Sequence, residues 1–550
     1  MSEDIKHECA VAMVVLRKLP VATGDFGGTK LSLLLEKQHN RGQDGAGAAI
    51  LSANPEPGEL PYWIAKSASA TPLADVLGAI GRRALSSERI FLGHLRYATF
   101  GKNEEKFCHP FVHESSELAH TLLLAGNFNL TNAHELFDEY AHHGSFPTSK
   151  ADGYLITELV AHELAGGKSL AGSISAALDE ADGAWTLCGM TGDGWAFATR
   201  DPCGIRPGFY YMDDSVVVVA SERPAIQAAL DVPPEAVKEL PRGEALIVSP
   251  DGDVAFAPVL PPRPSRRCVF ERIYFSRAND ADIHRERKAL GAALLPQILE
   301  AADSPLEDIF FSYIPNSARI AFHGLLERLF DEHGKIRFGE IAVKDAKFRT
   351  FIANAAARRE FYKHVYDVTY GLVRSGLDTL VVLDDSIVRG NTMKNAILPM
   401  LDRLCPKRIV VASSAPPIRY PDCYGIDMST LDELVAFRAL VNLLNKEQGT
   451  GNGELELTKS LDSGAPNPLM SLYAHFTDEQ HCDEIARLLT PPRMKAEVKV
   501  VYQTIDALHS ACPGSSGDWY FTGDYPTPGG YKVLHKALEN YLDKRNDRSY

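Results

Sequence analysis

Paired cysteines, long apolar runs and an excess of basic residues are all missing from this sequence of 550 residues. Its nine cysteines are scattered and none stands in a C-x-x-C motif, which argues against a disulfide framework and a zinc ribbon. No apolar stretch is long enough to span a bilayer, and residues 1–8 lack the apolar core of a signal peptide. A formal net charge of −15 disfavours general binding to nucleic acids, which requires a basic surface. We therefore expect a soluble, cytoplasmic protein with neither a membrane nor a nucleic-acid partner.

The length predicts more than one folding unit. A chain of 550 residues is expected to form two or three domains, and its 45% hydrophobic and 23% charged content is typical of globular domains. Residues 258–267 are rich in Pro and Arg and indicate a domain boundary. Because the chain is acidic overall, a phosphate-bearing ligand would require Arg and Lys to be concentrated locally.

The most informative stretch is residues 379–392. Residues 379–383 are mostly apolar and predict a buried parallel strand. Asp384 and Asp385 follow where this strand should end, and a polar turn with Gly390 leads into apolar residues at helical spacing. A helix N-terminus favours an anion, and adjacent carboxylates can bind sugar hydroxyls or Mg²⁺. The stretch therefore predicts a nucleotide or sugar-phosphate site; the alternative is an ordinary turn whose acidic residues only cap the helix.

This stretch resembles the 5-phosphoribosyl 1-diphosphate (PRPP) loop of type I phosphoribosyltransferases, in the form found in the amidophosphoribosyltransferase family. The resemblance implies a domain with a mostly parallel sheet, in which Asp384 and Asp385 bind the ribose hydroxyls directly or through Mg²⁺. It also implies that backbone N–H groups of the turn hold the 5-phosphate. The PRPP-binding residues expected here are Asp384, Asp385, Ser386, Ile387, Val388, Arg389, Gly390, Asn391 and Thr392.

Two further segments resemble parts of the same site. Residues 309–319 take the place of the family's pyrophosphate loop, with Ser317 as a donor, although the loop departs from the usual pattern. Residues 343–351 resemble the lid that closes over PRPP, and Lys344 and Arg349 would meet the diphosphate. A solvated basic turn is the alternative for this second segment.

In the first half of the chain, polar segments containing glycine come directly before or after apolar runs. Cys9 opens the apolar run of residues 9–16, and by position alone it would be a small buried hydrophobic residue. Short strands that end in Asn, Asp, Arg and Gly predict a layered α/β domain whose strand ends converge on a small polar ligand. The polar segments are residues 38–47, 93–99, 126–132 and 149–153.

Together these segments resemble the glutaminase domain of class II glutamine amidotransferases, an N-terminal-nucleophile (Ntn) hydrolase fold of four layers, αββα. The resemblance implies that Cys9 is the catalytic nucleophile, exposed as the first residue once residues 1–8 are removed. A terminal cysteine has its own α-amine as general base, so no separate histidine is needed. The family usually has Gly after the nucleophile, where this chain has Ala10.

The resemblance also assigns roles around the expected nucleophile. Asn127 and the backbone N–H of Phe128 match the oxyanion hole, although the family usually has Gly in place of Phe128. Arg96 matches the clamp on the glutamine α-carboxylate, since its planar fork suits two oxygens. Asp152 matches the acceptor of the α-amine, and Gly126 is a further glutamine contact.

The two resemblances together predict one enzyme that hydrolyses glutamine at Cys9 and passes ammonia to PRPP. The products would be 5-phospho-β-D-ribosylamine, glutamate and diphosphate, in the first committed step of de novo purine biosynthesis. The alternatives are a phosphoribosyltransferase that uses free ammonia only and a non-catalytic sensor of PRPP or nucleotides. The family also implies purine nucleotides as feedback inhibitors and a homo-oligomer, either a dimer or a tetramer.

The expected organisation has four parts. A propeptide (1–8) precedes a glutaminase domain (9–257) and a phosphoribosyltransferase domain (268–435), and a C-terminal extension (436–550) packs on the latter. Residues 445–461 read as an exposed loop or insertion. Some relatives carry an iron–sulfur cluster with ligands from a C-x-x-C at the position of residues 517–520, a motif missing here, so we expect no cluster. On the helix expected near residue 285, solvent exposure is the default for Arg285 and Arg287.

Overall fold

The computed structural model describes residues 9–18, 25–52, 58–83, 88–97, 104–142, 146–344, 366–448, 452–545 and 547–549. The expected propeptide and Arg349 lie outside the described residues, as do the side chain of Lys344 and the rest of the expected lid after it. Within the described ranges, no helix is long and apolar enough to cross a membrane.

The N-terminal unit contains two antiparallel sheets. The seven-stranded sheet has the order β11-β9-β10-β1-β4-β2-β3 and the six-stranded sheet the order β13-β12-β8-β7-β6-β5. The strands of the first sheet are β1 (Ala10–Leu16), β2 (Gly45–Ser52), β3 (Tyr62–Ser67), β4 (Glu88–Arg96), β9 (Phe209–Met212), β10 (Val216–Ala220) and β11 (Lys238–Glu239). Those of the second are β5 (Phe111–His113), β6 (Leu122–Leu130), β7 (Gly183–Thr191), β8 (Ala196–Arg200), β12 (Glu244–Val248) and β13 (Val254–Pro258).

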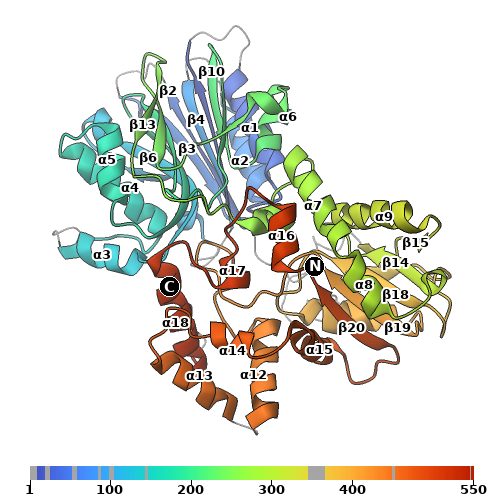
Figure 1. Ribbon diagram of the computed structural model, residues 1–550. Helices are drawn as coiled ribbons and strands as arrows, with labels where there is room; N and C mark the ends of the chain where they lie inside the picture. Colours follow the sequence, from blue (N-terminus) through green and yellow to red (C-terminus); the bar gives the residue numbers. More distant parts are fainter. Residues whose placement is uncertain are drawn as a thin grey trace.

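Helices cover the outer faces of both sheets. Strand β1 is buried on both sides: Val11 and Met13 face the second sheet, whereas Ala12 and Val14 face helices. This double burial explains why β1 is a continuous apolar run rather than an alternating one. The helices are α1 (Phe26–Lys37), α2 (Pro72–Gly81) and α6 (Arg223–Leu230) on the first sheet, and α3 (Ala133–His142), α4 (Asp152–Ala165) and α5 (Leu170–Leu178) on the second. The result is the expected αββα layering (Figure 1).

The second unit is built on a five-stranded parallel sheet in the order β15-β14-β18-β19-β20. Val381 and Leu383 of β18 face one layer of helices, and Leu380 and Val382 face the other. The strands are β14 (Ile309–Tyr313), β15 (Arg337–Phe338), β18 (Thr379–Asp384), β19 (Arg408–Ser413) and β20 (Glu497–Tyr502). The covering helices are α8 (Leu295–Ala302) and α9 (Arg319–His333) on one face, and α11 (Leu398–Asp402), α12 (Val435–Gln448) and α15 (Asp478–Leu489) on the other.

The sheet extends beyond the segment expected to contain it. Strand β20 pairs with β19 and comes from residues 436–550, which the sequence suggested were only a C-terminal extension. The stretch 445–461 is also not a long loop, because α12 continues to Gln448 and α13 (Asn452–Asp462) follows. Leu457 of α13 is fully buried, and Gly453 is buried within the same helix, so the glycine in this stretch does not prevent a packed helix.

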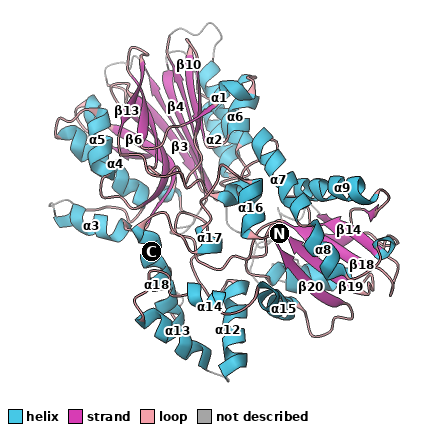
Figure 2. Cartoon of the chain, in the orientation of Figure 1, coloured by secondary structure: helices cyan, strands magenta, loops and turns pink. Residues whose placement is uncertain are grey.

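A short ribbon and several further helices complete the described fold. The short ribbon of β16 (Ala342–Lys344) and β17 (Tyr366–Val368) is separate from the parallel sheet. The other helices are α7 (Ala281–Ala293), α14 (Met470–Ala474), α16 (Ile505–Ala511), α17 (Trp519–Thr522) and α18 (Pro528–Leu542). Figures 1 and 2 show α16 and α17 between the two sheet-containing units, with α12, α13, α14 and α18 grouped below them.

A buried ion-pair network joins the two units. Arg41, in the turn before β2, donates to Glu222 at 2.7 Å and to both carboxylate oxygens of Glu271 at 3.0 and 2.6 Å. All three side chains are almost completely buried. Glu271 belongs to the segment that enters the second unit, so the network fixes one unit against the other.

Removing the cation from this network is expected to destabilise the protein strongly. Arg41→Leu leaves two buried carboxylates without a counter-charge, which should reduce the free energy of unfolding by about 3–5 kcal/mol. The matched control is Arg285→Leu, because Arg285 is exposed and pairs with Asp282 on the surface; it should cost less than about 1 kcal/mol. Denaturant unfolding of the two variants measures the difference, and equal midpoints would contradict a structural role for the network.

Candidate functional site

The thiol of Cys9 lies at an edge where several strands of the first sheet end. Cys9 directly precedes β1, and its Sγ accepts a hydrogen bond from the N–H of Tyr97 at 3.4 Å. The pairing of β1 with β4 sets Ala10 opposite Leu95, which brings Arg96 next to the cysteine. Burial, the largest cause, raises the pKa of the Cys9 thiol to about 12, and Arg96 acts in the opposite direction. The thiol is therefore protonated at neutral pH and needs a base before it can attack.

Charged groups of both signs lie close to this thiol. Arg96 is buried at the end of β4, and its guanidinium lies 5.7 Å from the centroid of the Phe107 ring. Asp152 is half-buried at the start of α4, and Gly153 N–H donates to its Oδ1 at 3.0 Å. Burial raises the pKa of Asp152 to about 6, while the cations Arg548 and Arg96 lower it. A cation and an anion close to one thiol are suited to an amino acid, with its α-carboxylate and α-amine.

The expected oxyanion residues lie within a strand rather than in a turn after one. The sequence suggested that residues 126–132 follow a short strand ending near Leu124, but β6 continues to Leu130. Asn127 is buried, and its neighbour Phe128 is half-buried. The strand continues because residues 183–187 of β7 pair with residues 126–130. Pairing across the sheet thus overrides the turn-like composition.

Opposite Phe128, the backbone of Trp185 faces away from β6. Trp185 O accepts from Asp201 N–H at 2.9 Å, and Trp185 N–H donates to the Asp201 carboxylate at 3.4 Å. In an antiparallel pair such a residue does not bond to the residue facing it. Phe128, which pairs with Trp185, therefore turns its own N–H away from β7, toward the open edge of β6.

The expected PRPP loop follows β18 in the second unit. Asp384 ends this strand, and both Asp384 and Asp385 are buried at the sheet's C-terminal edge. The N–H of Asp385 donates to Asp384 Oδ1 at 3.0 Å, and Ser386 Oγ donates to Asp385 Oδ1 at 2.9 Å. A hollow of about 420 Å³ opens beside them; it is lined by Tyr274, Ile314, Asp384, Asp385, Ser386, Ile387, Val388, Gly390, Thr392, Met393 and Ile397.

The backbone, not the arginine side chain, forms the inner surface of this loop. Gly390 has φ +75°, and a Cβ there would collide with Leu489, so glycine is required. The Arg389 guanidinium pairs with Glu433 at 2.7 Å and with the carbonyl of Asp427 at 3.1 Å. Asn391 is exposed, and a helical segment begins there with a π-turn, Met393–Ile397. Single π-turns of this kind are frequent at functional sites.

Ser317 connects the expected pyrophosphate loop to the acidic pair. Its Oγ donates to Asp385 Oδ2 in a short hydrogen bond. Both oxygens of Asp385 therefore accept serine hydroxyls, and burial, the largest cause, still raises the pKa of this carboxyl. The structure brings together in this way two loops that are about 70 residues apart in sequence.

Arg287 lies near Asp385. The sequence favoured solvent exposure for Arg287, and that expectation is wrong. Arg287 is buried and donates to the carbonyls of Arg272 and Ser276, each at 2.7 Å. Burial lowers its pKa to about 10, so it remains a cation beside the acidic pair. A signal was present, because Arg287 is three residues before Leu290 and shares the apolar face of α7. Arg285 is exposed, as expected.

The acidic pair fits Mg²⁺ in the chemistry of its donors. Carboxylate oxygens are hard ligands, and Mg²⁺ is commonly bound by one or two of them together with substrate phosphates and water. Within the described ranges, no group of three or more His, Cys, Asp and Glu side chains is placed to hold a metal ion. A site of two carboxylates, Asp384 and Asp385, therefore needs the oxygens of a substrate to complete it.

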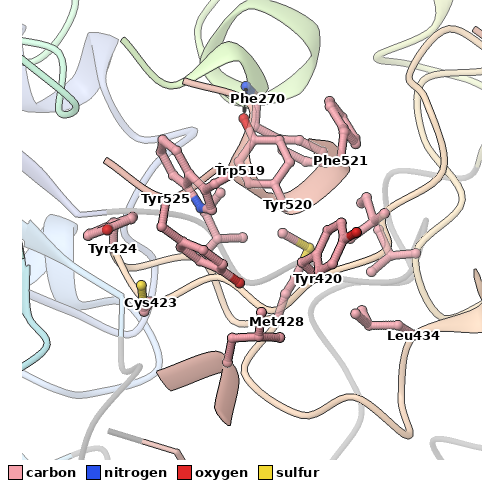
Figure 3. Close-up of a cluster of buried hydrophobic side chains, with 14 of the residues drawn as sticks. Phe270, Tyr420, Cys423, Tyr424, Met428, Leu434, Trp519, Tyr520, Phe521 and Tyr525 are labelled. Atoms are coloured by element: carbon pink, nitrogen blue, oxygen red, sulfur yellow. Dashed lines mark hydrogen bonds between the residues drawn. The ribbon is translucent and has the colours of Figure 1, made fainter. Parts of the chain in front are cut away.

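Aromatic side chains fill the region around residues 517–520 (Figure 3). The Tyr520 hydroxyl accepts from Phe270 N–H at 2.6 Å and lies 3.4 Å from Cys268 Sγ. Trp519 Nε1 donates to Asp422, next to Cys423, at 2.8 Å. Residues of both units contribute to this core, which also contains Cys203 and Ile205 of the N-terminal unit.

One direct hydrogen bond joins the strand of the first site to the second unit. Asn129 Nδ2 donates to the carbonyl of Cys423 at 2.7 Å, and the amide is buried. Asn129 is two residues beyond Asn127 on β6, so it lies on the same face of the strand. Val388 of the expected PRPP loop belongs to the same buried core as Cys423, so both candidate sites border this interface.

Comparisons with known proteins identify what the two sites have in common. A family model described as a glutamine amidotransferase domain matches residues 97–228. The amidophosphoribosyltransferase of Bacillus subtilis (strain 168) is 32% identical over 367 residues, which cover 65% of this chain and 72% of that protein. That of Pseudomonas aeruginosa is 30% identical over 370 residues, or 63% of this chain and 70% of that protein. The chain belongs to the amidophosphoribosyltransferase family.

Solved structures agree with this assignment over nearly the whole chain. The glutamine PRPP amidotransferase of B. subtilis, complexed with ADP and GMP, has a TM-score of 0.67 at 25% identity and covers 94% of this chain and 97% of that one. A structure described as the allosteric regulatory enzyme of purine biosynthesis has a TM-score of 0.70 at 26% identity, with 94% and 96% covered. A glutaminase domain followed by a phosphoribosyltransferase domain with a parallel sheet, the fold expected from the sequence, is confirmed.

The raised pKa of Asp152 predicts how glutamine binding depends on pH. Below pH 6 the carboxyl is protonated and loses the negative charge that an α-ammonium requires, so KM for glutamine should rise by up to about tenfold per pH unit. Asp152→Asn should have a high KM that stays constant over the same range. Steady-state glutamate release from pH 5 to 8 measures both, and a flat KM in the natural protein would contradict the assignment.

The acidic pair should be required for any reaction of PRPP. Asp385→Asn replaces a charged acceptor by an amide and should reduce the rate with ammonia as nitrogen source on the order of 100-fold. The matched control is Asp402→Asn, because Asp402 only accepts from backbone N–H groups of residues 495 and 496 at the far end of the sheet. Similar rates for both variants would exclude Asp385 from the site.

Proposed function

We propose that this chain forms 5-phospho-β-D-ribosylamine, glutamate and diphosphate from glutamine, PRPP and water, the first committed step of de novo purine biosynthesis. One observation carries the proposal: a cysteine flanked by Arg96 and Asp152 and an acidic pair at the end of a parallel strand occur in one chain and meet a common interface. The first arrangement suits an amino acid, and the second suits a sugar diphosphate.

The glutaminase half requires a free N-terminus at Cys9. Removal of residues 1–8 would expose an α-amine, which has a pKa near 8 in model compounds and can take the proton of a thiol that burial keeps neutral. The thiolate would attack the glutamine amide, and the tetrahedral oxyanion would accept from the Asn127 amide and Phe128 N–H. Collapse with protonation of the nitrogen would release ammonia and leave a glutamyl thioester, which water hydrolyses to glutamate.

Three residues would hold the substrate glutamine during this reaction. The Arg96 fork would bind the two oxygens of the α-carboxylate, and Asp152 would accept from the α-amine. Gly126 would be a further contact of the substrate; packing requires glycine here, since a Cβ would overlap Leu187 and Phe128. The geometry that favours these roles is a buried Arg96 and a half-buried Asp152 close to the thiol.

The transferase half would position PRPP and neutralise its charge. Asp384 and Asp385 would hold Mg²⁺, which when bound offsets the negative charge of the diphosphate leaving group. Backbone N–H groups of residues 386–392 would bind the 5-phosphate. Ser317, Lys344 and Arg349 would contact the diphosphate. Ammonia would then form a bond to C1 of the ribose as the bond from C1 to the diphosphate oxygen breaks.

Several further properties belong to the same proposal. The division into residues 9–257, 268–435 and 436–550 follows the expected domains. The last segment contributes β20 to the parallel sheet of the transferase domain. The Ntn-hydrolase mechanism, cytoplasmic location and lack of an iron–sulfur cluster are inferred in the same way. A relative was solved with ADP and GMP, which supports purine nucleotides as inhibitors of this chain. We also infer a homo-oligomer.

The alternative of an ammonia-only enzyme depends on Ala10 and Phe128, the two departures from the family pattern; the oxyanion hole involves Phe128. If its side chain prevented the N–H from reaching the oxyanion, PRPP would still react with free ammonia. The backbone N–H of Phe128 points away from β7, toward the open edge of β6, and this orientation favours a working glutaminase instead. A non-catalytic sensor would need neither Cys9 nor its two charged neighbours.

Replacing the nucleophile should separate the two activities. Cys9→Ala should lose PRPP-dependent glutamate release and keep synthesis of phosphoribosylamine from ammonia, because only the first site loses its reacting atom. Cys405→Ala is the control, since Cys405 is another partly exposed cysteine but lies after α11. Equal glutamine-dependent rates in Cys9→Ala and the natural protein would eliminate the nucleophile, as would fully active protein whose mass includes residues 1–8.

A further inference from the structure

Two stacked histidines lie beside the expected oxyanion hole, and the proposed mechanism does not use them. His94 is on β4 and His109 precedes β5; both are buried. Their ring centroids are 4.0 Å apart, and their planes differ by 14°. Stacked rings at this distance, away from solvent, are unfavourable as a pair of cations, so the arrangement requires a specific protonation state.

Hydrogen bonds to Gly126 define that state. His94 Nε2 lies 3.1 Å from Gly126 O, and since a carbonyl can only accept, Nε2 carries the proton. Gly126 N–H donates to His109 Nδ1 at 3.4 Å, so Nδ1 carries none. Among the described residues, none offers His94 Nδ1 a hydrogen bond. Both rings are therefore neutral, and burial, the largest cause, lowers the pKa of His94 to about 3 and that of His109 well below 6.5.

The rings replace a missing strand. Among the described residues, the pairing of β5 with β6 ends where Phe111 faces Leu124. The residue before Phe111 is Pro110, which has no N–H and cannot continue the ladder. Backbone groups on one edge of a strand recur at every second residue. The next groups after Leu124 on this edge are those of Gly126, which the histidines take, and the next are those of Phe128.

The same two rings touch the other parts of the glutamine site. The His109 ring centroid is 5.5 Å from that of Phe128. A Cβ on Gly153 would lie 3.1 Å from His109 Cε1, so this ring packs on the start of α4, next to Asp152. His94 is two residues before Arg96 on the same strand. The pair thus connects the oxyanion strand with both residues expected to hold the substrate.

We propose that His94 and His109 are positioning residues: a neutral pair that grips both backbone groups of Gly126 and thereby aims the Phe128 N–H at the oxyanion formed on glutamine. The inference rests on the proposed glutaminase function. It explains how β6 can present the Phe128 N–H although β5, its neighbour on that edge, pairs only as far as Leu124. Neither ring touches the reacting atoms, and neither transfers a proton.

The test uses substitutions matched to the nitrogen that each ring employs. His109→Asn places an amide oxygen near the position of Nδ1 and keeps the acceptor, whereas His109→Leu removes it. His94→Gln places an amide N–H near the position of Nε2 and keeps the donor, whereas His94→Leu removes it. The four variants are compared in the full-length enzyme by glutamate release and by ammonia-dependent synthesis of phosphoribosylamine.

We expect kcat for glutamine in the leucine variants to fall by about 10²–10³-fold, the usual cost of an oxyanion-hole donor, with little change in KM. The Asn and Gln variants should recover most of the rate, and the ammonia-dependent rate should remain in all four. A change in KM alone would show that the pair only shapes the pocket and would overturn the proposal. Equal rates in His109→Asn and His109→Leu would overturn it as well.

A second measurement does not depend on turnover. An aldehyde analogue of glutamine adds to the Cys9 thiol and forms a tetrahedral oxyanion, whereas the product glutamate does not. The leucine variants should bind the aldehyde more weakly by a factor similar to their loss of kcat and bind glutamate as the natural protein does. If they bind both equally weakly, the positioning role is wrong. If the natural protein releases no glutamate from glutamine at all, the proposed function has failed rather than this inference.

Discussion

The structure depends on a guanidinium that bridges two folding units without access to water. Arg41 belongs to the turn before β2, at the same sheet edge as Cys9, and its partners Glu222 and Glu271 lie on either side of the interface. Burial opposes ionisation of Glu271, but Arg41 outweighs it and lowers the pKa of that carboxyl. A buried charged side chain is tolerated only when nearly all of its N–H donors have acceptors in good geometry. The network therefore fixes the distance and the orientation between the units, and with them the relation of the two sites.

The N-terminal site illustrates how burial controls the chemistry that a side chain can perform. Cys9, Asp152 and the two histidines all have pKa values shifted toward their neutral forms, and in each case burial is the largest cause. A neutral thiol is a weak nucleophile, which is why the mechanism needs a base adjacent to it. Neutral imidazoles, in contrast, are what the Gly126 backbone requires. Burial thus keeps the Cys9 thiol protonated until a base is present, and it keeps the two histidines in the neutral form that bonds to Gly126.

The sequence was most informative where function and local structure need the same residues. The run from Thr379 to Thr392 predicted a buried parallel strand, an acidic pair and a helix start, because a strand buried on both faces must be apolar throughout and an anion site needs a turn with glycine. The αββα layering also followed from the family resemblance. Gly126–Phe128 could not be recognised as part of a strand, since pairing with β7 is determined by residues about 60 positions away. The same applies to β20, whose partner β19 is almost 90 residues earlier.

The residues that sequence reasoning missed share one property: they act through contacts with distant backbone. Arg287 and His109 each look like an isolated polar residue, and solvent or a plain core position is the better default for either. Only the fold shows that Arg287 binds two carbonyls beside Asp385 and that His109 completes the edge of β6. Both side chains bond to main-chain atoms next to a residue of a candidate site. For His109 the constraint is a single nitrogen: Gly126 N–H donates to Nδ1, so this position requires an acceptor and not merely a side chain of the right size.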